Sequence, residues 1–86
     1  MRELFVTTLR QDVHTTLAAL DNQDASGTAQ QLHSMAGALG AVQLVDLANA
    51  FVELELRLTG MAITPTLALE VRRNLARLTA LLDSFE

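Results

Sequence analysis

Residues 64–85 read TPTLALEVRRNLARLTALLDSF, and this stretch decides the fold class. Thr64 and Pro65 are typical of a helix start, because threonine caps a helix and proline suits its first position. Apolar residues then recur at steps of three and four, the period of one face of an α-helix. These positions are Leu67, Val71, Leu75, Leu78, Leu82 and Phe85. The stretch therefore predicts an amphipathic helix that continues to the C-terminus.

The same period recurs three times before residue 64. We expect helices over about residues 2–20, from residue 25 or 26 to about 40, and over about residues 43–58. Polar or turn-forming residues separate them, namely Asp21, Asn22, Gln23, Asp24, Gly40, Thr59 and Gly60. Short connections make neighbouring helices antiparallel. The sequence predicts an all-α, antiparallel up-down-up-down four-helix bundle that forms one domain over residues 1–86.

The segment from about residue 43 to residue 58 carries the widest apolar stripe in the chain. Its main line is joined by Val45, Val52 and Leu56, which broaden the apolar face. A broad apolar face is typical of a helix that is covered on more than one side. We therefore expect this helix to be buried against more than one neighbour.

Composition narrows the classes of function. The chain has 86 residues, is 50% hydrophobic, contains no cysteine and has a net charge of −4. Nucleic-acid binding is not expected, because it normally requires a basic surface. No apolar run reaches the roughly 20 residues that span a bilayer, so we expect no direct membrane insertion. A small bundle packed with leucine and alanine also leaves little room for a substrate pocket, and autonomous enzyme activity is not expected.

His33 is the best candidate for chemistry. Gly37 and Gly40 lie four and seven residues further on and share its side of the helix, and Gln30 lies one turn earlier. The helical period places the imidazole at the edge of the solvent face, about 110° from the buried stripe. Glycine in a helix costs up to about 1 kcal/mol relative to alanine. Two interpretations remain open: the glycines admit a large partner to His33, or they permit close helix crossing.

Other titratable residues do not form a recognisable site. His14 lies on a different predicted helix, has no glycine near it and is expected to be a solvated side chain without a role. No acidic residue lies one turn from His33 on its own helix, so no metal site is predicted. Glu53 and Glu55 are two residues apart and point to different sides of their helix, which makes them a poor carboxylate pair.

Residues 32–44, LHSMAGALGAVQL, resemble the second-helix motif of the histidine-containing phosphotransfer (HPt) family. The resemblance extends over nearly the whole chain. It implies that His33 is the phospho-acceptor of a phosphorelay and that the partners are receiver domains of two-component systems. No cofactor is implied in this chain, since the Mg²⁺ belongs to the receiver. Such domains often end a hybrid sensor histidine kinase, which implies a cytoplasmic location, with tethering to the inner membrane through the parent kinase.

Two positions depart from the family motif. The family's lysine, three residues after the histidine, is Ala36, and its common glycine, ten residues after the histidine, is Gln43. The missing lysine removes a cation from the neighbourhood of the phosphoryl oxygens. Charge neutralisation is then left to the partner or to an arginine from another helix. The alternative is a degenerate HPt domain, a helical interaction module that binds a receiver or a partner helix without being phosphorylated.

Overall fold

The computed structural model describes residues 2–60 and 62–85, and these residues form four helices without a strand. The helices are α1 (Arg2–Asp21), α2 (Ala25–Ala41), α3 (Val45–Thr59) and α4 (Pro65–Ser84). They confirm the predicted all-α bundle, and the predicted ends differ from the observed ones by at most two residues.

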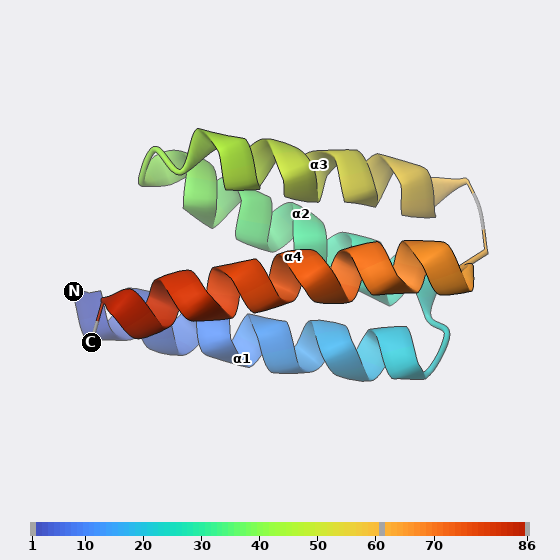
Figure 1. Ribbon diagram of the computed structural model, residues 1–86, viewed down its shortest axis with the longest axis horizontal. Coiled ribbons are helices and arrows are strands. Elements are labelled where there is room, and N and C mark those ends of the chain that lie inside the picture. Colours follow the sequence, from blue (N-terminus) through green and yellow to red (C-terminus); the bar gives the residue numbers. More distant parts are fainter. Residues whose placement is uncertain (1, 61, 86) are drawn as a thin grey trace.

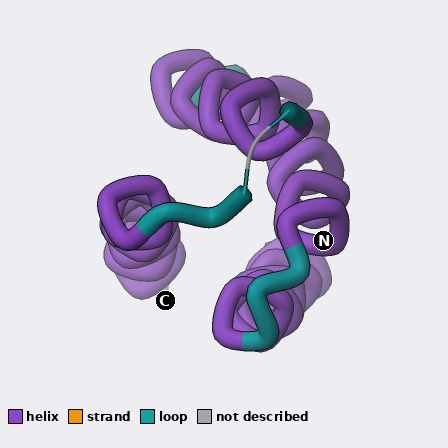
Figure 2. Tube along the Cα trace, turned by 90° about the vertical axis from the view of Figure 1, so that its right-hand side faces the viewer, coloured by secondary structure: helices purple, strands orange, loops and turns teal. Residues whose placement is uncertain are grey.

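Each helix runs antiparallel to the next, and the start of α1 lies beside the end of α4 (Figure 1). Contacts join α1 to α2, α2 to α3, α3 to α4 and α4 back to α1, whereas the diagonal pairs do not pack against each other. The view along the bundle shows this ring of four (Figure 2). The most extensive contact is between α2 and α3. The arrangement places α4 diagonally opposite α2.

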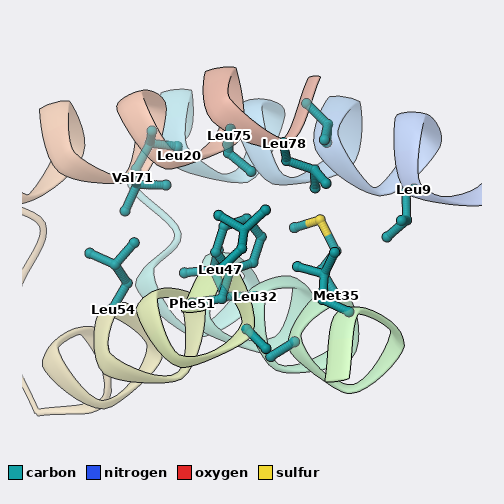
Figure 3. Close-up of a cluster of buried hydrophobic side chains, with 14 of the residues drawn as sticks. Leu9, Leu20, Leu32, Met35, Leu47, Phe51, Leu54, Val71, Leu75 and Leu78 are labelled. Atoms are coloured by element: carbon teal, nitrogen blue, oxygen red, sulfur yellow. The ribbon is translucent and has the colours of Figure 1, made fainter. Parts of the chain in front are cut away.

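The core is built from one apolar stripe of each helix. Phe51 is fully buried, and the leucines at positions 32, 39 and 78 are as well. Side chains from all four helices point into one shared interior (Figure 3). Burying a leucine or phenylalanine side chain contributes about 1.5 to 3 kcal/mol. The stripe predicted for α4 is buried from Leu67 to Leu82, as the period of the sequence indicates.

The prediction that α3 is buried against more than one neighbour is confirmed, because α3 contacts both α2 and α4. The residues that widen its apolar stripe are nevertheless exposed. Val45, Val52 and Leu56 have relative exposures of 54%, 40% and 68%. The reason lies in the ring arrangement, because α3 contacts only α2 and α4 and one stripe covers both contacts. The additional apolar residues therefore face away from the bundle.

Polar side chains mark the starts of α2 and α4. Asp24 caps α2 by accepting a hydrogen bond from the backbone N–H of Gly27 at 2.8 Å. Thr64 caps α4 by accepting one from Leu67 at 3.1 Å, and Pro65 occupies the first turn. Such caps satisfy backbone donors that have no partner inside the helix. The start of α4 is thus set as the sequence predicts.

A residue with positive φ ends each of the first two helices. Gln23 has φ 59° and Gln43 has φ 65°. At the end of α2, Gln43 donates its backbone N–H to Gly40, and Leu44 donates to the carbonyl of Leu39. This pair of bonds is the Schellman motif, whose left-handed position usually holds glycine. Gln43 stands where the HPt family commonly has glycine. It therefore adopts a left-handed backbone conformation that is unfavourable for a residue with a Cβ atom.

Replacing Gln43 by glycine should stabilise the protein by about 0.5 to 1 kcal/mol. The glycine removes the cost of the left-handed backbone, and its greater freedom in the unfolded chain offsets part of that gain. Thermal unfolding followed by circular dichroism should show a Tm about 2 to 8 °C higher. Gln31→Gly inside α2 is the matched control and should lower the Tm, because glycine is unfavourable in a helix interior. A Gln43→Gly protein that melts below the parent would contradict this account of the turn.

Candidate functional site

His33 lies on the exposed edge of α2, as its spacing from the buried stripe predicts. Its side chain is 76% exposed, while Leu32 beside it is fully buried. The imidazole Nδ1 lies 3.2 Å from Oε1 of Glu55, which comes from α3. The Glu55 side chain is only 24% exposed, so it sits in the seam between the two helices. The site is therefore formed by two helices.

The contact with Glu55 determines which ring nitrogen of His33 can react. An ionised carboxylate accepts hydrogen bonds but cannot donate them. Nδ1 must therefore carry the proton and donate it to Glu55. In the neutral ring, Nε2 is then left with the free electron pair. A mostly exposed imidazole with a free Nε2 has the electron pair and the access that a nucleophile requires.

Glu55 is the residue of the site that the helical spacing around His33 does not predict. It is paired with the imidazole of His33, not with a second carboxylate, and the absence of an acidic residue on the histidine's own helix is compensated by α3. A signal exists in the sequence, because His33 and Glu55 are equally far from Leu44 in the connection between the helices. In an antiparallel helix pair, residues at equal distances from the turn come to lie side by side.

A groove between α2 and α3 opens beside His33. Gln30 lines it from α2, and Glu55 and Thr59 line it from α3. Its apolar wall includes Ala29 and Leu58. The structure thus places Gln30 next to His33 on the same face, as the sequence predicts, and the groove gives a partner side chain access to this end of the site.

Gly37 and Gly40 are exposed and lie on open space. A Cβ atom built on either glycine would meet no other atom within 4 Å. The interpretation that they permit close helix crossing is therefore wrong. The surface one and two turns beyond His33 carries no side chain that would obstruct an approaching molecule. Their role in admitting a partner stays a prediction, and the open surface is what it requires.

His14, and Ala36 in place of the family's lysine, lie outside the groove beside His33. His14 is exposed on α1, as expected, and does not line the groove beside His33. Ala36 is buried, with 7% exposure, one turn after His33. Its small side chain belongs to the packed part of α2, so this turn supplies no charge at the surface.

Two features are absent from residues 2–60 and 62–85. No cluster of three or more histidine, cysteine, aspartate or glutamate side chains could hold a metal ion. Within the same residues, no helix combines the length and the apolar character that crossing a membrane requires.

Comparison with protein families identifies the family of this chain. The family model described as Hpt domain matches residues 1–83. The protein belongs to the Hpt domain family, which is a family of phosphotransfer modules, and its four-helix bundle agrees with that assignment. Neither the curated proteins nor the solved structures include a match to the chain.

Adding a methyl group at Gly37 should raise stability. Gly37→Ala gains up to about 1 kcal/mol of helix propensity and meets nothing in space. The Tm should rise by about 4 to 8 °C for each kcal/mol gained. Gly27→Ala is the control in the same helix and should melt lower, because its Cβ would collide with the capping carboxylate of Asp24. A Gly37→Ala protein less stable than the parent would show that this surface is not open.

Proposed function

We propose that the domain is a phosphorelay intermediate that accepts a phosphoryl group on His33 from a receiver aspartyl phosphate and passes it to another receiver. The observation that carries the proposal is the hydrogen bond from Nδ1 of His33 to Glu55 on an otherwise exposed ring. Membership of the Hpt domain family supports phosphotransfer in general. The open surface at Gly37 and Gly40 supports the approach of a large partner.

Transfer of the phosphoryl group depends on how Nε2 of His33 is positioned. The free electron pair of Nε2 attacks the phosphorus of the aspartyl phosphate, a P–N bond forms, and the P–O bond to the aspartate breaks. The leaving carboxylate stays on the receiver, and the proton on Nδ1 does not move. Phosphoryl transfer depends mainly on alignment and on charge stabilisation. Here α2 and Glu55 hold the nucleophile, while the receiver supplies the metal ion Mg²⁺ that offsets the phosphoryl charge.

The proposal extends to the setting of the domain. As a module of a hybrid sensor histidine kinase, it would act in the cytoplasm, and tethering to the inner membrane would come through the parent kinase. The domain contributes no nucleotide site and no cofactor of its own in this scheme. Phosphotransferase activity would belong to the assembled system, with this bundle as its carrier.

A second candidate function is a non-phosphorylated interaction module. Ala36 in place of the family lysine favours it, as do the exposed side chains of Val52 and Leu56 next to Glu55 on α3. Under this hypothesis the same face binds a receiver or a partner helix, and His33 never carries phosphate. A domain that binds receivers but takes up no label from any phosphorylated receiver would support it over the relay.

Substitution of each histidine tests the relay directly. With a panel of receivers loaded from acetyl phosphate, the parent should acquire an acid-labile, base-stable label. His33→Gln should reduce the label to background, because glutamine offers no nucleophilic nitrogen. His14→Ala should be labelled at the rate of the parent, since His14 lies outside the groove. Uptake of label by His33→Gln would sink the assignment of His33, and loss of label in folded His14→Ala would reverse the ranking of the two.

A longer side chain at position 37 should obstruct transfer more than folding. Gly37→Gln places a flexible side chain one turn from the imidazole while keeping a good helix former. We expect a Tm at or above that of the parent and a transfer rate at limiting receiver concentration lowered at least about tenfold, the cost of about 1.4 kcal/mol in the encounter. Unchanged transfer by a folded Gly37→Gln protein would remove the role of this glycine in access.

A further inference from the structure

The phosphorylated state of His33 would inherit the contact with Glu55. Attack by Nε2 leaves the proton on Nδ1, so the phosphorylated ring begins as a cation that faces the carboxylate. That carboxylate lies 3.2 Å from Nδ1 and is largely shielded from solvent. A hydrogen bond from a cationic ring to a carboxylate is stronger than one from the neutral ring to the same carboxylate. Glu55 therefore favours retention of the proton on the phosphorylated ring.

Protonation of the ring decides how easily the phosphoryl group leaves. When the P–N bond of the protonated ring breaks, the electron pair returns to Nε2 and the ring departs as neutral imidazole. The unprotonated ring would have to leave as the imidazolate anion, which is a far poorer leaving group. The acceptor is the receiver aspartate, or water in its absence, and no further reactant is needed. Holding the proton on Nδ1 thus makes the phosphohistidine reactive.

No other charged residue among those described along the groove opposes the hold of Glu55 on the Nδ1 proton. Among the described residues that line the groove, Glu55 is the one formal charge besides any on His33 itself. On α2 the neighbours one turn away are Gln30, Ala36 and Gly37, which are uncharged. On α3, the closest arginine in sequence is Arg57, and it pairs with Glu70 of α4 at 2.5 Å. These charges leave the phosphoryl oxygens to be neutralised from outside the groove.

We propose that His33 carries its phosphoryl group in a kinetically labile form, and that Glu55 sets this by holding the proton on Nδ1. The inference rests on the proposed function and deepens it. It makes the domain a carrier that releases its phosphoryl group quickly, because the ring leaves as neutral imidazole. Glu55 acts through the imidazole and is a positioning residue.

The test measures the lifetime of the phosphoryl group on the isolated domain. In a His14→Ala background, His33 is loaded with phosphoramidate, the donor is removed, and the decay at pH 7 is followed by ³¹P NMR. Glu55→Gln keeps an acceptor but removes the charge, and it should lengthen the half-life about three- to tenfold, the equivalent of about 1 kcal/mol. Glu53→Gln is the matched control, with the same change of charge on the exposed side of α3, and should decay like the parent.

A second measurement places the same variants in equilibrium with a receiver. Glu55→Gln should retain a smaller share of the phosphoryl group on His33 than either the parent or Glu53→Gln, because Glu55 stabilises the phosphorylated cation more than the neutral ring. A purely structural role of Glu55 would not lengthen the lifetime of the phosphohistidine. Half-lives that are equal in Glu55→Gln and Glu53→Gln, or shorter in Glu55→Gln, overturn this inference. Failure of every receiver to exchange phosphate with the parent overturns the proposed function instead, because phosphoramidate loads the histidine without a receiver.

Discussion

The packing of α2 against α3 is the constraint on which the rest of the site depends. It is the most extensive contact between helices in the bundle, and small residues such as Ala29 and Ala36 occupy α2 beside its fully buried leucines. This antiparallel contact brings two residues 22 positions apart into hydrogen-bonding distance. The hydrogen bond of Nδ1 to Glu55, the free Nε2 and the groove beside His33 all follow from this one interface. The helices α1 and α4 complete the core that keeps it rigid.

Much of the fold could be predicted from sequence because its signals are local. The period of the apolar residues and the pairing of Thr64 with Pro65 depend only on neighbours along the chain, and both correspond to what the structure shows. The edge position of His33 follows from the same helical geometry. Glu55 was out of reach of such rules, since its role depends on the register between two helices. The wide apolar stripe of α3 correctly predicted more than one neighbour, but a helix period cannot tell that Val45, Val52 and Leu56 stay exposed.

Charge is distributed unevenly over the bundle. Among the described residues, ion pairs join α4 to its neighbours: Arg10 with Asp83, Arg57 with Glu70, and Arg72 with Asp21. Exposed pairs of this kind contribute little to stability, typically below about 1 kcal/mol each. Their position is more informative, because α4 does not pack against α2. Each of these three arginines belongs to α4 or is paired with it, whereas the histidine on α2 faces a carboxylate.

The end of α2 combines several residues that weaken a helix. Gly37 and Gly40 have low helix propensity, and Gln43 closes the turn in a left-handed conformation. Only Leu39 among the last three residues of the helix is fully buried and anchors it to the core. Local opening events should therefore begin here, and amide hydrogen exchange should be faster in these two turns than in the middle of α3. The surface that a partner would approach in the proposed relay then includes helical turns that can adjust their shape at a low free-energy cost.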